Sequence, residues 1–422
     1  MIRGVCFTSK TSASSACRET LLIMPPEPSP PPQLKEWFDA ARYRAIAKEL
    51  ASIAPKFRAD EFMKMVLDGL EARSLMQRVH QCAVAVDAAL PGTYQQKVRA
   101  LQKLAPRIGH EFVTIFLGDF VATYGLDDFD FSMEALRFFT VFGSAEFAVR
   151  PFILADQKRA LQMMHAWTAD PDEKVRRLAS EGSRPRLPWG MRLQALVRDP
   201  EPTAKILEAL KDDDSLFVRR SVANHLNDIT KDHHDYVLQR LEVWDLERKH
   251  LKWIAKHACR TLIKRGHPRA LKLFGFGKKA EVTAKLAASP SRLELGQRLT
   301  LTAALTSTSS RSQRLAIDYV VHYIKASGGS AEKVFKWTEI DLPAHANVAT
   351  AFEQLRHDGR LPPTIEAEFA AEARARGAES AFLEVAENAL LDHVVQIIGL
   401  MGKFKKERIG KQLKASETEN IL

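Results

Sequence analysis

A six-residue phrase occurs twice in this chain, with its two starts 43 residues apart, at Val175 and at Val218. The first copy reads VRRLAS and the second reads VRRSVA. This spacing falls within the period of about 40–47 residues that is typical of solenoids built from helix pairs, such as HEAT or armadillo repeats. Helix pairs of this kind bury their apolar faces by stacking on their neighbours. The repeat therefore predicts a mainly α-helical solenoid.

The second copy indicates which way its helix faces. At about 100° per residue, one side carries four apolar residues: Val218, Val222, Leu226 and Ile229. The other side mixes cationic, amide and carboxylate groups: Arg220, Asn224, Asn227, Asp228 and Lys231. We expect the first side to face the core and the second to face an anionic ligand. In the first copy, Arg177 and Glu181 occupy the positions of Arg220 and Asn224, so a carboxylate lies at the matching point of that repeat.

The segment between the copies reads SEGSRPRLPWG over residues 180–190. It cannot form one helix, because Pro185 and Pro188 each lack a backbone donor and restrict the residue before them. We predict a loop that presents two arginines and Trp189. Residues 248–262 are a third, degenerate copy, in which Ile254, Ala258 and Leu262 would form the apolar side.

The residues of this region resemble a known family. SEGSRPRLPWGMRL followed by VRRSVANHLNDITKDH is closely similar to the signature of the AlkC branch of bacterial alkylpurine DNA glycosylases, whose relatives include the AlkD branch. The resemblance extends from about residue 37 to residue 276, and more weakly to about residue 343. It implies a HEAT-like repeat fold and a monofunctional DNA repair glycosylase without a cofactor. The implied substrates are 3-methyladenine and, as a second candidate, 3-methylcytosine.

The resemblance also implies the roles of individual residues. A cationic alkylated base leaves readily, so the main task of such an enzyme is to stabilise an oxocarbenium-like sugar and to position water. By resemblance we place this task on the carboxylates of Glu146 and Asp228, with Glu181 and Trp189 beside the lesion. The electron-rich face of Trp189 would favour a cationic base over a neutral one. The family further implies a concave solenoid that bends DNA and approaches the sugar side of the lesion.

Several of these residues also have structural interpretations. Ser144 is a predicted N-cap, which would place Glu146 in a first helical turn, where the helix dipole favours a carboxylate. Asp228 is spaced to form a surface ion pair with Lys231. Glu181 could equally pair with Arg177 or Arg184 and orient them, and Trp189 could be an ordinary loop anchor.

The charge balance favours an anionic partner. The chain has 62 basic and 52 acidic residues, a formal net charge of +10, which fits nucleic acid or an acidic membrane surface. Guanidinium and ammonium groups suit phosphate, and we take six residues as phosphate-contact candidates: Arg177, Arg184, Arg186, Arg219, Arg220 and Lys231. The resemblance implies double-stranded DNA with alkylated bases as the partner of a monomer. The alternative is a non-enzymatic HEAT-repeat scaffold that binds nucleic acid or an acidic protein.

Cysteine and histidine spacing gives no sign of a metal site. Cys6, Cys17, Cys82 and Cys259 form no CxxC pair. The histidines near Asp228, which include His225, show no metal-ligand spacing with a carboxylate. So few cysteines fit a reducing cytosol, and we expect Cys82 and Cys259 to be buried. The resemblance implies a bacterial cytoplasmic, nucleoid-associated protein. No apolar run approaches the roughly 18 residues that a membrane span requires.

The remaining segments define the expected domains. Residues 1–34 read as a disordered tail with a proline-rich linker, and Met24 is an alternative start. Residues 35–277 form the repeat domain. Residues 278–347 contain four strand-like runs, at 282–286, 298–303, 316–324 and 333–340, which predict a small β-sandwich of immunoglobulin type, as the resemblance also implies.

Residues 348–422 depart from the family pattern. They are rich in Ala and Glu, and we predict helices at 366–376 and 380–401, followed by a basic tail from Lys403. Two explanations stay open. Either the β-domain is incomplete and helices cover its unpaired edge, or the reading frame of the gene has shifted.

Overall fold

The computed structural model describes residues 34–110, 112–276, 280–289, 298–324, 330–356, 366–376 and 381–383. The expectations for the tail and linker, the start at Met24, Cys6, Cys17, the helix beyond residue 383 and the basic tail lie outside the described residues. Within them, Cys82 and Cys259 are free and buried, as predicted. No described helix is long and apolar enough to cross a membrane.

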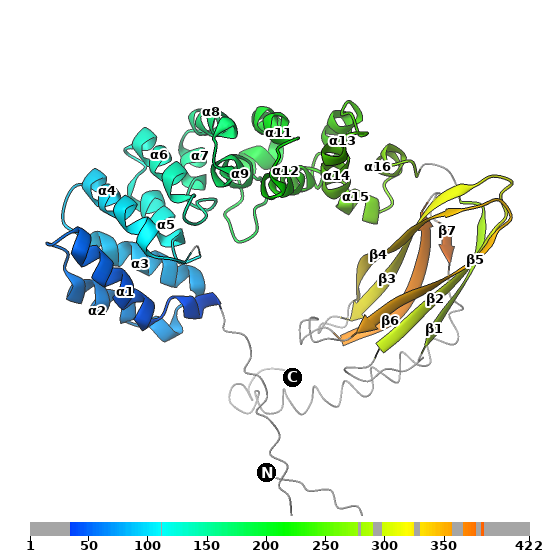
Figure 1. Ribbon diagram of the computed structural model, residues 1–422, viewed down its shortest axis with the longest axis horizontal. Helices are drawn as coiled ribbons and strands as arrows, with labels where there is room; N and C mark the ends of the chain where they lie inside the picture. Colours follow the sequence, from blue (N-terminus) through cyan, green and yellow to red (C-terminus); the bar gives the residue numbers. More distant parts are fainter. Residues whose placement is uncertain are drawn as a thin grey trace, which may run out of the picture.

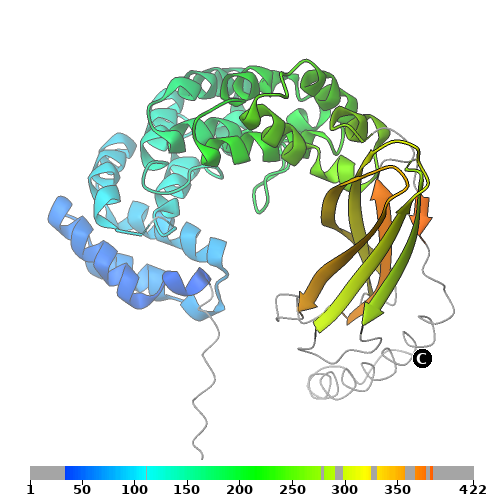
Figure 2. The same cartoon turned by 45° about the vertical axis from the view of Figure 1, so that its right-hand side comes forward.

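The first part of the chain is a curved array of helices (Figures 1 and 2). Its α-helices are α1 (Ala40–Ile53), α2 (Ala59–Leu67), α3 (Leu75–Ala89), α4 (Tyr94–Leu104), α5 (Ile115–Tyr124), α6 (Phe129–Phe139), α7 (Arg150–Ala155), α8 (Gln157–Ala166), α9 (Glu173–Gly182), α10 (Gln194–Arg198), α11 (Ala204–Leu210), α12 (Leu216–Ile229), α13 (His234–Glu242), α14 (Lys249–Ala258), α15 (Arg260–Lys264) and α16 (Pro268–Leu273). Short 3₁₀ turns lie at η1 (Leu34–Trp37), η2 (Leu70–Ala72), η3 (Ala105–Arg107), η4 (Trp167–Ala169) and η5 (Glu201–Thr203). The predicted helical solenoid is confirmed.

The repeat seen in the sequence corresponds to stacked helices. Figure 1 shows α8, α11 and α13 along the outer side of the arc and α9, α12 and α14 along its inner side. The two copies of the phrase lie in α9 and α12, which pack against each other, and α12 also packs against α14. The repeat extends to the caps: Asp172 caps α9 and Ser215 caps α12, and these residues are 43 positions apart, from 172 to 215. A side-chain oxygen at each cap accepts a hydrogen bond from a first-turn amide.

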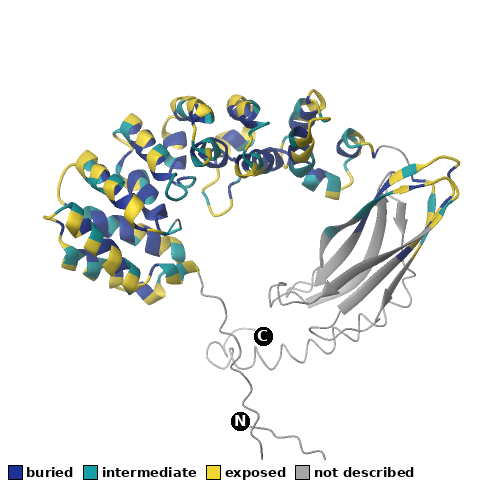
Figure 3. Cartoon of the chain, viewed as in Figure 1, coloured by how far each residue is buried: buried dark blue, intermediate teal, exposed yellow. Residues whose placement is uncertain are grey.

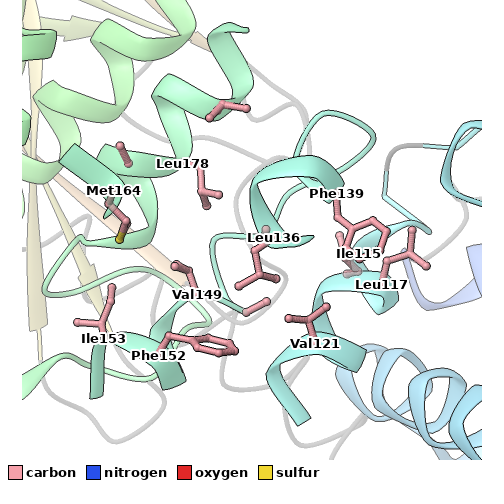
Figure 4. Close-up of a cluster of buried hydrophobic side chains, with 14 of the residues drawn as sticks. Ile115, Leu117, Val121, Leu136, Phe139, Val149, Phe152, Ile153, Met164 and Leu178 are labelled. Carbon is pink, nitrogen blue, oxygen red and sulfur yellow. The ribbon is translucent and has the colours of Figure 1, made fainter. Parts of the chain in front are cut away.

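The apolar sides of these helices form one continuous core (Figure 3). Val218, Val222, Leu226 and Ile229 are all buried, as predicted. In the degenerate third copy, Ile254, Ala258 and Leu262 are buried as well, although the helix breaks at Cys259 between α14 and α15. Figure 4 shows the neighbouring part of the core, in which Val149 and Phe152 at the start of α7 lie with Leu136, Met164 and Leu178. Tight packing here holds the segment before α7 against α9.

The predicted N-cap at Ser144 is wrong. The helix begins at Arg150, with Val149 at the N-cap position and Pro151 in the first turn. Proline favours the first turn because its missing N–H would be unpaired there in any case. The hydroxyl of Ser144 instead donates to the carboxylate of Glu146.

The second part of the chain forms two antiparallel sheets. Its strands are β1 (Val282–Ser289), β2 (Arg298–Ser307), β3 (Gln313–Ile324), β4 (Ser330–Leu342), β5 (Asn347–Arg356), β6 (Glu366–Arg376) and β7 (Ala381–Leu383). The sheet orders are β1-β2-β5 and β4-β3-β6-β7. Leu305, Leu315, Ile317 and Leu342 form a small core between them. The four predicted strand regions are confirmed as β1 to β4.

The predicted change to helix after residue 347 is wrong for residues 348–356 and 366–376. These segments are strands β5 and β6, which pair with β2 and β3 respectively. The predicted helix from residue 380 is also wrong for residues 381–383, which form strand β7 and pair with β6. Ala and Glu favour helix in isolation, but pairing with a neighbouring strand and burial on a sheet decide the conformation here. Strands β5 and β6 pair with the edges of β2 and β3 that a shorter β-domain would leave unpaired.

Polar and apolar contacts join the two parts. Leu271 and Phe276 form an apolar cluster with Ala316 of β3, and Lys256 of α14 forms an ion pair with Glu339 of β4. Arg314 binds Glu339 as well, at 3.2 Å. The β-sheets therefore lie against the end of the arc that contains α14 to α16 (Figure 1).

Candidate active site

Asp228, near the end of α12, is held by two cations. Its Oδ2 accepts a hydrogen bond of 2.9 Å from Nε of Arg184, and its Oδ1 accepts one of 2.9 Å from Nζ of Lys231. The predicted pair with Lys231 is thus present, but only as part of a larger arrangement. Asp228 is 2% exposed, so this carboxylate is buried, whereas the side chain of Lys231 that binds it is 41% exposed.

Glu181, in the last turn of α9, lies on the other side of the same arginine. Nη1 of Arg184 donates to Oε1 of Glu181 at 2.6 Å, and the hydroxyl of Ser221 donates to Oε2 at 2.6 Å. One guanidinium therefore binds carboxylates from two neighbouring repeats. Burial by itself would lower the pKa of Arg184, but the charges of Glu181 and Asp228 outweigh it and raise the pKa.

Glu146 lies before α7 and is linked to Glu181 through Arg177. Nη1 of Arg177 donates to Oε2 of Glu146 at 2.7 Å, and Nη2 lies 3.7 Å from Oε1 of Glu181. The guanidinium of Arg177 also lies over the ring of Phe217, 4.6 Å from its centroid. A row of alternating charges results: Glu146, Arg177, Glu181, Arg184, Asp228 and Lys231. We call it the carboxylate row.

A buried arginine that the sequence did not reveal holds the loop beside this row. The guanidinium of Arg150 donates to the carbonyl oxygens of Gly182 and Arg184, both at 2.9 Å, and to that of Met191 at 2.7 Å. Burial lowers the pKa of Arg150 to about 10. The three carbonyls lie at both ends of the loop after α9, so Arg150 fixes its shape. A lone arginine before a proline gave no sequence signal for this role.

Trp189 is the exposed tip of that loop. Its side chain is 72% exposed, and its backbone has a φ of 63°, a left-handed conformation that is costly for a tryptophan. Leu187 is buried and anchors the loop, so the interpretation of Trp189 as the loop anchor is not supported. The loop projects from the inner side of the arc (Figures 1 and 2). An apolar ring held there in a strained conformation is available for contact with a ligand.

Two predicted phosphate contacts belong to the interior instead. Arg184 is buried and Arg177 is nearly so, and both donate to carboxylates of the row. The guanidinium of Arg184 therefore does not suit a phosphate contact. Arg177 and Arg184 instead pair with Glu181, so that the carboxylate and the two arginines orient each other, as the structural interpretation of Glu181 predicted.

The other predicted phosphate contacts lie at the surface. Arg186 forms a bidentate ion pair with Asp232, with both N–O distances at 2.7 Å. Arg219 donates to the carbonyl of Asp214 at 2.8 Å, at the start of α12. Arg220 is exposed and forms no ion pair with a described residue. Lys231 is exposed apart from its bond to Asp228.

Two polar residues near Asp228 are structural. Asn227 is buried and donates to the carbonyl of Ala258 at 2.7 Å and to Oγ1 of Thr261 at 3.0 Å. It therefore connects two repeats, and the expectation that it faces a ligand is wrong. Nδ1 of His225 donates to the carbonyl of Ser180 at 3.0 Å. Burial lowers the pKa of His225 to about 3. Within the described residues, no cluster of His, Cys, Asp and Glu is arranged to hold a metal ion.

Two family models match the chain in separate regions. The model of the DNA alkylation repair enzymes matches residues 136–262, which include the whole carboxylate row. The model of the C-terminal Ig-like domain of the uncharacterised protein YhaZ matches residues 282–357. The second match confirms the immunoglobulin type expected for the β-domain.

Two relatives cover most of the chain. The alkylpurine DNA glycosylase AlkC of Pseudomonas fluorescens, solved bound to DNA that contains an abasic site analog, is 46% identical, with a TM-score of 0.77. The match covers 83% of this chain and 97% of that one. The uncharacterized protein YhaZ of Bacillus subtilis (strain 168) is 38% identical over 311 residues, which are 73% of this chain and 86% of that protein. Both likenesses extend beyond the repeats into the β-domain.

Proposed function

This chain belongs to the AlkC-type family of alkylpurine DNA glycosylases, and we propose that its substrate is double-stranded DNA that carries cationic, N3-alkylated bases. The proposed reaction is hydrolysis of the N-glycosidic bond of 3-methyladenine, with 3-methylcytosine as a second substrate of the same charge. The protein would act as a monomer on the bacterial nucleoid. The observation that carries this proposal is the carboxylate row, which extends from Glu146, before α7, to the inner helices α9 and α12.

The row suits a reaction in which positive charge moves to the sugar. A cationic base leaves as a neutral molecule, and the deoxyribose becomes oxocarbenium-like, so fixed carboxylates next to the sugar stabilise the transition state. Because guanidinium groups already bind the three carboxylates, little reorganisation is needed when that charge develops. We assign the direct role to Glu146 and Asp228, with Glu181 beside the lesion.

Access to Asp228 depends on Lys231. The lysine side chain is 41% exposed, whereas that of Asp228 is 3% exposed. A DNA phosphate that draws Nζ of Lys231 away would uncover Oδ1 of Asp228 toward the sugar, while Arg184 keeps hold of Oδ2. Since Lys231 is engaged by Asp228 and then by phosphate, water and not an amine would be the nucleophile, as in a monofunctional glycosylase.

Trp189 and the surface cations account for DNA binding. The exposed ring of Trp189 would pack against the lesion nucleotide, where its electron-rich face favours a cationic base. Arg186, Arg220 and Lys231 would contact phosphates, which supplies affinity and register without reading the sequence. DNA would then lie along the inner side of the arc, where the loop after α9 projects (Figure 2).

A lesion panel tests the proposed substrate class. Release of free base is measured with duplexes that contain 3-methyladenine, 3-methylcytosine, or the neutral lesions hypoxanthine and 1,N6-ethenoadenine. We expect release of both cationic bases and none above background of the neutral ones, since a neutral base gains nothing from the tryptophan face and leaves as an anion. Equal release of neutral lesions would contradict the proposal.

A further inference from the structure

Asn224 lies one helical turn before Asp228 on α12, and its side-chain orientation is fixed. Its Oδ1 accepts from Nη2 of Arg260 at 3.1 Å and from Nε2 of His257 at 3.2 Å. A guanidinium group can only donate, so the atom that faces Arg260 must be the amide oxygen. The NH₂ group of Asn224 must therefore point the other way.

That NH₂ group has two donors to offer. The side chain of Asn224 is only partly buried, and among the described residues no acceptor lies within hydrogen-bonding distance of its Nδ2. Arg220, one turn earlier on the same helix, is exposed and forms no ion pair with a described residue. Within the described part of the chain, an amide and a guanidinium without acceptors thus lie one turn apart on the inner face of α12.

The surroundings are cationic and favour an anion. Arg260 lies behind Asn224, and burial lowers the pKa of its guanidinium despite the nearby charge of Asp228. Burial, together with the charges of Arg260 and Arg220, lowers the pKa of His257 to about 4. His257 is therefore neutral at pH 7, and its Nε2 carries the proton that Asn224 accepts. Trp253 stacks on the ring of His257, with centroids 5.1 Å apart, which helps to fix this donor.

The repeat explains why this position is informative. Asn224 occupies the place that Glu181 holds in the preceding repeat, 43 residues earlier, from 181 to 224. There the carboxylate takes part in the carboxylate row. The amide of Asn224 at the matching point has no negative charge and presents N–H donors. This position therefore suits an anion, whereas Glu181 suits a developing cation.

We propose that the amide of Asn224, together with Arg220, binds a backbone phosphate that flanks the lesion nucleotide. Four residues of α-helix rise by about 6 Å, which is one to two nucleotides at about 3.4 Å per nucleotide. A sugar held at Asp228 would therefore place a neighbouring phosphate at Asn224. This inference rests on the proposed function, because it takes the ligand to be DNA.

The variant Asn224→Asp tests the donor without disturbing the fold. An aspartate has nearly the same shape and still accepts from Arg260 and His257, but it replaces the outward NH₂ with a negatively charged oxygen. The dissociation constant is measured for a duplex with a tetrahydrofuran abasic analogue, which cannot be hydrolysed, over a range of salt concentrations. We expect it to rise about 10-fold or more. Because the new carboxylate also neutralises Arg220, the slope of log K against log salt should fall by about 0.9. Thermal stability should be unchanged or higher.

A matched control and a second variant accompany it. Gln239→Glu makes the same change from amide to acid at an exposed position of the outer helix α13, and we expect it to leave the salt slope unchanged. Arg220→Gln, at an exposed site, should reduce the slope as Asn224→Asp does. If Asn224→Asp folds poorly, Arg220→Gln still gives the decisive slope.

Neutral phosphate substitutions identify the contact. Single methylphosphonates are placed at each phosphate next to the abasic analogue. At one of them the wild-type protein should lose affinity while Asn224→Asp loses little more, because the contact is already gone. Two results would overturn the inference. The first is that both variants keep the affinity and salt slope of the wild type. The second is that Asn224→Asp weakens binding by the same factor whichever phosphate is replaced. Base release by the wild-type protein is scored separately, so a failure of the proposed reaction is distinguishable from a failure of this contact.

Discussion

Nε of Arg184 donates a 2.9 Å hydrogen bond to Oδ2 of Asp228, across 44 residues of sequence. The same guanidinium binds Glu181 at 2.6 Å. Because both carboxylates are buried and come from neighbouring repeats, Arg184 fixes the distance between α9 and α12 at the candidate active site. Its role is to hold the carboxylates, which distinguishes it from the surface arginines of the same region.

Replacement of Arg184 should lower the free energy of unfolding. In Arg184→Met, the carboxylates of Glu181 and Asp228 lose their shared buried partner, and breaking such a pair costs about 3–5 kcal/mol. We expect a loss of this size in the free energy of unfolding, measured by urea denaturation. Arg220→Gln is the control and should change it by less than about 0.5 kcal/mol. Equal stability of the two variants would mean that Arg184 does not hold the row.

Trp189 should be dispensable for folding and needed for turnover. Trp189→Gly removes the left-handed strain of about 1 kcal/mol, and the greater freedom of glycine in the unfolded chain offsets a similar amount. The free energy of unfolding should therefore change by less than about 1 kcal/mol. Base release under single-turnover conditions should fall at least about 10-fold, since the stacking contact with the lesion is lost. Unchanged release with Trp189→Gly would remove Trp189 from the site.

Arg150 should control the shape of the loop that carries Trp189. In Arg150→Lys, the single ammonium nitrogen cannot reach the carbonyls of Gly182, Arg184 and Met191 together, as the planar guanidinium does. We expect faster trypsin cleavage after Arg186 and Arg192, measured by mass spectrometry under native conditions. Cleavage elsewhere on the surface, for example after Arg248, is the internal reference. A uniform increase at all sites would indicate general destabilisation instead of a loosened loop.

The pH dependence of stability should reflect His225. Its pKa is about 3 in the folded protein against an ordinary value of 6.5, so the unfolded chain binds more protons between these values. Stability is therefore lost as the pH falls below about 6.5, by about 2 kcal/mol between pH 7 and pH 5 from this group. Urea denaturation at the two pH values measures it. In His225→Gln this part of the pH dependence should disappear, and a pH dependence equal to that of the wild type would contradict the assignment.

Much of the repeat domain could be predicted from the sequence because one pattern specifies several features. The 43-residue repeat and the apolar spacing from Val218 to Ile229 predicted α9, α12 and the side that each buries. The repeat matched Glu181 to Asn224, and the family resemblance placed Glu181 and Asp228 at one site. The loop with Trp189 followed from two prolines.

The remaining features depend on contacts that are distant in the sequence. Nothing local shows that Arg184 turns inward while Arg186 turns outward, or that Arg150 reaches three carbonyls of a loop more than 30 residues later, at |i−j| values of 32, 34 and 41. Strands β5 and β6 were missed because their Ala-rich and Glu-rich composition favours helix until a partner strand is present. Asn224 was placed on the ligand side, but its donor orientation depends on Arg260, 36 residues away.

Single-turnover base release by Asp228→Asn tests the central claim most directly. The change removes one negative charge from the carboxylate row and keeps the shape of the side chain. With duplex DNA that contains 3-methyladenine at saturating protein, the account predicts a loss of about 10²–10³ in the rate of release, while the affinity for the abasic analogue stays within a few-fold of wild type. Release at the wild-type rate by a folded, DNA-binding Asp228→Asn variant would contradict it.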